Sequence, residues 1–452
     1  MFSEQEVKDL IGQVIGYSKL PGCDVYVNWT EDAFIRFANN GITTSGYRVT
    51  QSINITSTTA DHRSGNAAVT EITPAALKAG VKQAEDLAMI SRPDPEFMPS
   101  LPAQKYPKLN NLDAFTATAR GDVMVPQVKA ILAGATKNKL VAAGYIQRSL
   151  NAVGVGNKAG LSGYHTYTDS SLSHTMRNPE GTSSGWATQS GVSLKDLNGA
   201  EQAEVSIQKC LGGVNRRKLD PGKYTVILEP AAVADVIGWL GFAFRARAAE
   251  EGQSFLSKTD SSIEPGSGKI SKTYLGEKLF PEIITLRSDP FHPKLASTPW
   301  GPSLLPNEKI AWIDKGVVSS LYYDRFWAQK AGKKSTPSPG NLVLEGQNNT
   351  LNDLIASVDR GLLVTRLWYI RVVQPKTWQL TGLTRDGVFL VEKGKVTDAV
   401  NNFRWNESPA EILQRTTKLT QPVRVNNDET GSNMAPALIT TDFNLTSVSE
   451  AV

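Results

Sequence analysis

Histidine side chains are the commonest metal ligands in proteins, and this chain of 452 residues contains four of them, His62, His165, His174 and His292. A zinc peptidase helix needs two imidazoles about one turn apart on one face, with a carboxylate that activates the bound water. None of the four has a second histidine four residues further on. His165 and His174 could meet across neighbouring strands, but without companion ligands we expect both to be ordinary strand or surface residues.

A second pattern concerns serine chemistry. The segment 181–185, Gly-Thr-Ser-Ser-Gly, matches the G-x-S-x-G motif of serine hydrolases, which places its serine on a sharp turn between a strand and a helix. The residues that follow are poor in helix formers, so a glycine-rich strand edge is the favoured interpretation. An enzyme that uses Ser183 or Ser184 with His165 or His174 is therefore the least favoured hypothesis.

Four charged residues are candidates for a peptide-binding groove: Arg245, Arg247, Glu250 and Glu251. Arg247 has the two glutamates three and four residues further on, at the end of a predicted helix. Such spacing is typical of a solvent-exposed helix end with weak ion pairs. The functional alternative is that these charges line a groove and orient a bound peptide.

An aromatic cluster lies later in the chain, where Trp368, Tyr369 and Trp378 are close to Arg366 and Arg371. Tryptophan, tyrosine and arginine are enriched at the centres of protein interfaces. An alternating strand that contributes to a core explains the same pattern. The sequence leaves both interpretations open.

The elements that must position these residues begin with a helix. Ser3 and Glu6 form a capping box, and the apolar stripe that follows ends near Gly16. Alternating apolar residues then predict strands between residues 23 and 55, with a hairpin turn at 39–41.

Further helices and strands complete the first domain. Thr73 and Pro74 begin a second helix, and a third is expected over 126–135. Short strands are expected from residue 140 to residue 189. We therefore expect an N-terminal domain with an α/β layer structure.

A domain boundary is placed at a polar, turn-rich stretch that follows a helix predicted over 197–211. The first domain then comprises residues 1–218 and the second comprises residues 219–452. The second domain is expected to contain one long helix over 230–251 with a buried apolar stripe. After it, short strands separated by Pro- and Gly-rich loops predict a β-rich domain curled into a barrel or a sandwich. The fold class is α+β.

Composition excludes several classes of protein. The net charge of +4 arises from 48 basic and 44 acidic residues spread along the chain, whereas nucleic-acid binders concentrate positive charge. No apolar run reaches the roughly 18 residues of a membrane span, and the N-terminus has no signal-peptide pattern. Cys23 and Cys210 lie far apart, which fits a reducing compartment. We expect a cytoplasmic protein without nucleic-acid or membrane partners.

Several blocks of the sequence resemble the TldD/PmbA (TldE) family, also called modulators of DNA gyrase. In the second half of the chain these blocks are 222–230, 252–256, 276–280, 313–318, 386–396 and 442–447. The N-terminal helix, the hairpin strands and the helix that begins at Thr73 and Pro74 resemble the first domain of the family. The resemblance covers essentially the whole chain and depends on the order and spacing of the blocks.

In that family the catalytic member carries a His-Glu-x-x-x-His motif on the long helix and a cysteine near the C-terminus as a further zinc ligand. Here the matching stretches are apolar at 236–244 and lack cysteine at 428–434. The resemblance therefore implies a PmbA/TldE-like member that binds no cofactor itself, with zinc held by a TldD-like catalytic partner. It implies a non-catalytic subunit of a heterodimer that processes unfolded peptides. The alternative is a stand-alone homodimer that binds peptides without cleaving them.

Overall fold

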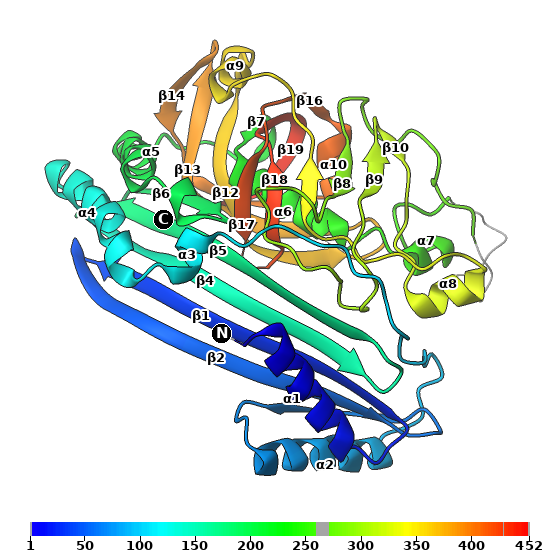
Figure 1. Cartoon of the computed structure of the whole chain (residues 1–452). Helices are drawn as coiled ribbons and strands as arrows, with labels where there is room; N and C mark the ends of the chain where they lie inside the picture. Colours follow the sequence, from blue (N-terminus) through cyan, green and yellow to red (C-terminus); the bar gives the residue numbers. More distant parts are fainter. Residues whose placement is uncertain (1, 259–270, 428, 451–452) are drawn as a thin grey trace.

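The computed structural model describes residues 2–258, 271–427 and 429–450. Its N-terminal part is a six-stranded antiparallel sheet with the strand order β3-β2-β1-β4-β5-β6 (Figure 1). The strands are β1 Gly22–Ala38, β2 Gly41–Thr58, β3 Ser64–Val69, β4 Val141–Asn157, β5 Ser162–Arg177 and β6 Ser184–Gly191. Sheets and helices together confirm the predicted α+β class.

The first two strands are long and continuous. β1 has 17 residues and pairs with β2 along its whole length. Asn39 and Asn40 close this hairpin with φ of 50° and 59°, so the predicted turn is confirmed. Left-handed backbone at both positions matches the twist of the flanking strands, and asparagine tolerates it better than most residues.

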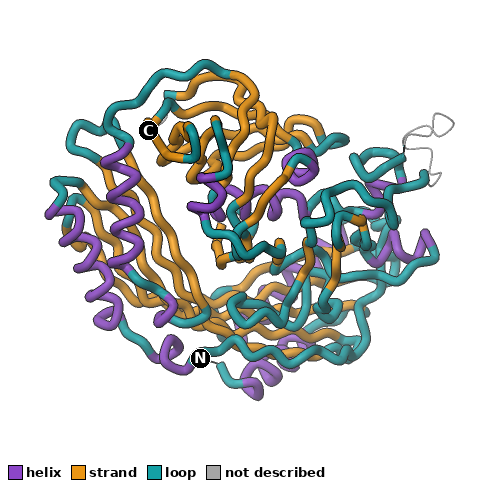
Figure 2. The backbone as a smooth tube through the Cα atoms, turned by 90° about the horizontal axis from the view of Figure 1, so that it is seen from above, coloured by secondary structure: helices purple, strands orange, loops and turns teal. Residues whose placement is uncertain are grey.

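Helices cover one face of this sheet. They are α1 Glu4–Tyr17, α2 Pro74–Ile90, α3 Ala114–Thr118, α4 Gly121–Lys137 and α5 Gly199–Gly212. Alternate residues of β1, such as Val25 and Ile35, are buried against them, because successive side chains of a strand point to opposite faces. Figure 2 shows the helices on the outer side of the curved sheet and the C-terminal part on its inner side. In the described part of the chain, every helix falls short of the length and apolar character that a membrane crossing requires.

The C-terminal part contains a seven-stranded sheet with the order β12-β7-β19-β15-β13-β14, in which β12 also pairs with β13. Five strands, from β12 round to β13, therefore form a closed ring, as in a small barrel. The strands are β7 Gly222–Leu228, β12 Arg360–Gln374, β13 Gln379–Glu392, β14 Lys395–Ala399, β15 Asn402–Glu407 and β19 Leu438–Ser449, with β16 Thr416–Leu419 paired to β19. Buried Leu390, Phe403 and Trp405 belong to the core of this part.

A third sheet has six short strands in the order β10-β9-β8-β11-β18-β17. They are β8 Leu286–Ser288, β9 Ile310–Asp314, β10 Val317–Val318, β11 Leu342–Leu344, β17 Val423–Asn427 and β18 Gly431–Ala435. Short helices connect the strands: η1 Leu194–Asp196 in the N-terminal part, and α8 Arg325–Ala331, α9 Leu351–Ala356 and α10 Pro409–Gln414 in the C-terminal part. The predicted boundary at 218 and 219 falls between α5 and β7, and the division of the chain into two domains stays a prediction.

The expectation of one long helix over 230–251 is wrong, because two helices occupy this segment. α6 Pro230–Gly241 ends after three turns, and α7 Ala246–Glu250 follows a four-residue link that begins with a turn. Tyr322 N donates to Phe244 O at 2.7 Å, and Ala246 N donates to Tyr322 O at 2.9 Å. These tertiary hydrogen bonds satisfy the backbone of the link in place of helical ones. The apolar residues of α6, such as Val233 and Ile237, have the helical spacing that we predicted and are buried in the hydrophobic core of the C-terminal part.

Candidate functional site

A cavity of about 450 Å³ lies where the inner face of the N-terminal sheet meets α6 and β12. The sheet supplies one wall, which consists of Tyr145, Gln147, Ser171, Ser173, Trp186 and Thr188. The opposite wall consists of Ala231, Asp235, Arg366, Leu367, Trp368, Tyr369, Ile370, Asn426, Asn427 and Glu429. Segments far apart in the sequence therefore build this cavity together.

A second cavity, of about 710 Å³, lies along the C-terminal end of α6. It is lined by Trp239, Phe242, Ala243, Arg245, Ala248, Gln253, Ser254, Arg371, Pro375, Trp378 and Glu429. Glu429 lines both cavities, and Arg371 Nη1 donates to Glu429 Oε1 at 3.2 Å where they join. The two cavities are named together the α6 groove.

Two residues near the C-terminal end of the chain, Asn427 and Thr430, lie directly on α6. Asn427 Nδ2 donates to Asp235 Oδ1 at 2.9 Å. One turn further along the helix, a Cβ atom on Gly238 would overlap the side chain of Thr430. Helix and turn are therefore in van der Waals contact at this point. These are the two segments that the resemblance makes equivalent to the zinc-carrying segments of the catalytic member.

The side chains at this place do not fit a zinc ion. Zinc takes three or four nitrogen, sulfur or carboxylate ligands at about 2 Å. α6 offers Asp235, which already accepts a hydrogen bond from Asn427, and otherwise apolar side chains such as Val236 and Ile237. In the described ranges, no three His, Cys, Asp or Glu side chains are close enough to share a metal. The groove is therefore suited to binding through hydrogen bonds and apolar contacts, and the absence of a cofactor stays a prediction.

Strand β12 borders the groove with an unpaired edge. β13 pairs with one edge of β12 as far as Gln374, whereas β7 pairs with the other edge only through residues 362–364. Within the described residues no strand continues on the β7 side beyond Val364. An unpaired edge leaves backbone donors and acceptors to which an extended peptide can pair. Bulges between Val364 and Arg366 and between Trp368 and Arg371, with φ of 54° at Tyr369, limit regular pairing to short stretches of this edge.

The aromatic cluster lies along this edge and the adjoining turn. Trp368 and Tyr369 are 42% and 55% exposed, so the core interpretation is wrong for both. Trp378 is half-buried, and its Nε1 donates to Trp239 O at 2.8 Å. The interface interpretation stays a prediction.

The structure separates the four charged residues that we predicted as groove residues. Arg245 is exposed and lines the aromatic end of the α6 groove. Arg247 lies outside it, where its Nη1 donates to Glu96 Oε2 at 2.8 Å and its Nε donates to Glu251 Oε1 at 3.4 Å. A role of Arg245 in peptide binding stays a prediction.

Glu250 is directed into the core instead of a groove. It is 7% exposed, and its two carboxylate oxygens accept from Tyr323 Oη and Trp327 Nε1, both at 2.6 Å. Burial, together with the hydrogen bond to Glu250, raises the pKa of Tyr323. Because Glu250 anchors α7 to α8 through these bonds, it cannot also line a groove wall.

The serine motif does not form a catalytic arrangement. Ser183 Oγ donates to Cys210 O at 2.5 Å, and Ser184 Oγ donates to Asp386 Oδ1 at 3.0 Å. β6 begins at Ser184, so the expected strand is confirmed and no helix follows the motif directly. Both hydroxyls therefore serve packing between neighbouring elements.

The two strand histidines lie apart from these serines. His165 Nε2 is 2.9 Å from Asn111 Oδ1, and His174 Nε2 is 2.8 Å from Ser206 Oγ. Burial lowers the pKa of each ring to about 4. Both rings are therefore neutral at pH 7 and act as buried hydrogen-bonding residues, as expected for structural histidines.

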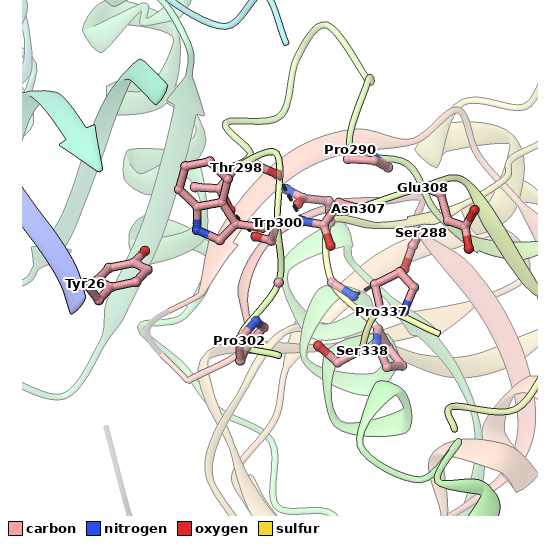
Figure 3. Close-up of a pocket in the computed structure, with 14 residues that line it drawn as sticks. Tyr26, Ser288, Pro290, Thr298, Trp300, Pro302, Asn307, Glu308, Pro337 and Ser338 are labelled. Carbon is pink, nitrogen blue, oxygen red and sulfur yellow. Dashed lines mark hydrogen bonds between the residues drawn. The ribbon is translucent and has the colours of Figure 1, made fainter. Parts of the chain in front are cut away.

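A further cavity, of about 560 Å³, lies between β1 and loops of the C-terminal part (Figure 3). Figure 3 shows Tyr26 on β1 facing the indole of Trp300. Two polar side chains of the loop form hydrogen bonds within it: Asn307 Nδ2 donates to Thr298 O at 2.9 Å, and Thr298 Oγ1 donates to Trp300 O at 2.8 Å. The α6 groove is the better candidate for ligand binding, because it adds exposed aromatic side chains and an unpaired strand edge.

Sequence reasoning missed most residues of the groove. Two groove residues stand out in the sequence. Asp235 is a lone carboxylate in an apolar helix, and Phe242 is a large apolar residue directly after Gly241, where that helix ends. Neither feature identifies Asn427, which is almost 200 residues away and reaches α6 only through the fold.

Family models match both the C-terminal half of this chain and its first strands together with helix α2. A family model described as the PmbA/TldA metallopeptidase C-terminal domain matches residues 221–447, half of the chain, and one described as PmbA/TldA metallopeptidase domain 1 matches residues 23–88. Metalloprotease PmbA of Escherichia coli O157:H7 is 24% identical over 374 residues, which cover 79% of this chain and 76% of that protein.

Solved structures show the same fold. TldE from Thermococcus kodakarensis matches with a TM-score of 0.83 at 21% identity, over 97% of this chain and 99% of that one. A protein from Bacteroides thetaiotaomicron, described as a candidate modulator of DNA gyrase, matches with a TM-score of 0.81 at 19% identity, over 98% and 100% of the two chains.

The fold and the family models together define an α+β protein of the metallopeptidase-related class. The chain belongs to the PmbA/TldD family, because the family model covers half of it and a second model of the same family matches its first domain. The resemblance seen in the sequence blocks is confirmed.

Proposed function

We propose that this chain is a non-catalytic subunit of a cytoplasmic peptidase complex, in which a TldD-like homologue carries zinc and this chain binds the unfolded peptide. The observation that supports the proposal most is the α6 groove. It combines an unpaired strand edge and exposed aromatic side chains with a helix whose one carboxylate, Asp235, has no further His, Cys, Asp or Glu close enough among the described residues to complete a metal site.

The β12 edge suits a substrate without a fixed sequence. Main-chain hydrogen bonds to a strand edge are made by any extended peptide, so they provide affinity with little sequence preference. Trp368 and Tyr369 add apolar surface beside the edge. Most strands of a folded protein are already paired within its own sheets, so the groove favours unfolded chains.

The wall of the groove is held in place before a peptide binds. Arg366 forms an ion pair with Asp386, and its guanidinium lies 4.4 Å from the ring centroid of Trp186 on the N-terminal sheet. Arg385 lies 4.2 Å from the ring centroid of Trp368. Such preorganisation lowers the entropy lost on binding.

The proposal is tested by mixing this chain with a homologue that carries the zinc motif. The purified chain, a homologue with the His-Glu-x-x-x-His motif and their mixture are compared for zinc content, co-elution and cleavage of an unstructured peptide. We expect zinc only with the homologue and the fastest cleavage in the mixture. Cleavage by this chain alone at the rate of the mixture would refute a non-catalytic role.

A variant pair links cleavage to the groove. Trp368→Ala should slow cleavage by the mixture severalfold without preventing co-elution, because it removes apolar surface beside β12. Phe291→Ala is the matched control, since Phe291 is a similarly exposed aromatic residue, 45% against 42%, outside the groove. Co-elution of two copies of this chain, with no binding of the homologue, would instead favour the stand-alone homodimer.

A further inference from the structure

Arg245 is a cation without an acidic partner at the edge of an aromatic cavity. It is exposed and lines the C-terminal end of the α6 groove. Among the described residues no carboxylate lies within ion-pair distance of its guanidinium, whereas its neighbour Arg371 is paired with Glu429 at 3.2 Å. An anionic group that enters this cavity therefore meets one uncompensated positive charge.

The aromatic side of the same cavity is rigid and open. The rings of Trp239 and Phe242 meet edge to face at 5.8 Å between centroids, and Phe242 remains 46% exposed. Trp378 is fixed against α6 by its hydrogen bond to Trp239 O. A large apolar side chain can therefore be enclosed by three aromatic residues without displacing a core residue.

We propose that the aromatic end of the α6 groove binds the C-terminal residue of a peptide, with Arg245 holding the α-carboxylate and the aromatic rings holding a large apolar side chain. The proposal rests on the proposed function, since it assigns a polarity to the bound peptide. A chain terminus fits this cavity better than an internal residue for a geometric reason. A C-terminal residue carries a carboxylate and a side chain on the same Cα atom, so both can reach one cavity.

The orientation of the peptide follows from this placement. A peptide whose last residue lies beside Phe242 would extend back past Arg371 and Glu429 toward Trp368 and the β12 edge, because Glu429 lines both cavities. The terminal residue would then be recognised, whereas the residues before it would be held mainly through their backbone. Selection of chain ends is compatible with a groove that otherwise ignores sequence.

The test is a binding measurement on the full chain by fluorescence anisotropy. The probes are an N-terminally labelled, unstructured ten-residue peptide that ends in phenylalanine, the same peptide with a C-terminal amide, and one that ends in glycine with a free carboxylate. We expect the free phenylalanine acid to bind about three- to fivefold more tightly than its amide, the scale of an ion pair at an exposed arginine. The glycine peptide should bind more weakly than the phenylalanine acid.

Variants of single residues test which side chains cause the preference for a free carboxylate and for phenylalanine. Arg245→Leu should bind acid and amide equally, whereas Arg92→Leu, which changes an exposed arginine outside the groove, should keep the wild-type preference. Phe242→Ala should weaken the phenylalanine peptide but not the glycine peptide. All three positions are exposed, and unchanged thermal unfolding would show that the variants are folded.

Several outcomes would overturn the assignment: equal binding of acid and amide by the wild-type chain, a preference that persists in Arg245→Leu, or no binding of any probe. Equally tight binding of an amide peptide with an internal glutamate would assign the anion to a side chain and overturn it as well. The outcome is separable from that of the mixing experiment. A carboxylate preference without cleavage in the mixture would refute the peptidase complex alone, and cleavage without the preference would refute only this subsite.

Discussion

An ion pair between Asp169 on β5 and Arg424 on β17 connects the N-terminal sheet to the C-terminal part beside the α6 groove. Arg424 Nη2 donates to both carboxylate oxygens of Asp169, at 2.8 and 2.9 Å. The side chain of Arg424 is 3% exposed and that of Asp169 is 26% exposed. We predict that Asp169→Asn destabilises the protein strongly, because it leaves a buried guanidinium without a counter-charge.

The size of this effect follows from burial. Removing one partner of a buried ion pair costs about 3–5 kcal/mol. Asp169 is partly exposed and Arg424 Nη1 keeps its hydrogen bond to Lys294 O at 3.0 Å, so we expect about 3 kcal/mol. An exposed pair is worth less than about 1 kcal/mol. Asp61 and Arg63 form such a pair at 2.7 Å, with 55% and 37% of their side chains exposed.

The assay is urea unfolding followed by tryptophan fluorescence, with Asp61→Asn as the matched control. We expect Asp61→Asn to stay within about 1 kcal/mol of the wild type. Combining Asp169→Asn with Arg424→Met should recover most of the loss, because no buried charge then remains. Equal small losses for Asp169→Asn and Asp61→Asn would show that the pair between the two parts contributes no more than a surface contact.

Three further predictions concern single sites. Burial lowers the pKa of His174 to about 4, so its contribution to stability is complete above the unfolded pKa of about 6.5 and is lost as the pH falls toward 4. The stability lost between pH 7 and pH 4.5 should therefore shrink by about 2 kcal/mol in His174→Asn, and an unchanged loss in urea titrations would contradict the reasoning. Gly238→Ala should cost about 1–3 kcal/mol in thermal unfolding because its Cβ overlaps Thr430, and adding Thr430→Gly should restore part of it. Glu250→Ala leaves two buried donors unpaired and should cost about 3 kcal/mol, whereas a loss no larger than that of Glu251→Ala would refute its anchoring role.

Local features of the fold were predictable because neighbouring residues determine them. Ser3 and Glu6 form the capping box of α1, and Thr73 caps α2 with Pro74 in the first turn. Asn39 and Asn40 close the first hairpin. Each of these features needs only side chains and backbone groups within a few residues, so the order of residues along the chain is sufficient to specify it.

Strand length and helix length depended on distant partners. β1 is continuous because β2 and β4 pair with it on both sides, although its apolar alternation is irregular between Trp29 and Ala33. α6 ends at Gly241 because Tyr322, about 80 residues later, supplies hydrogen bonds to the link that follows. A periodic pattern cannot report a partner that lies elsewhere in the sequence.

By itself the sequence determined the α+β class, the family and the lack of zinc ligands on the helix after Pro230, since these depend on which residues occur and in what order. Only the tertiary structure decided which side chains share the groove. It placed Arg245 in the groove and Glu250 in the core, although both belong to one short charged segment. The reason is that exposure depends on what packs against each residue, and α8 buries Glu250 while leaving Arg245 facing open space.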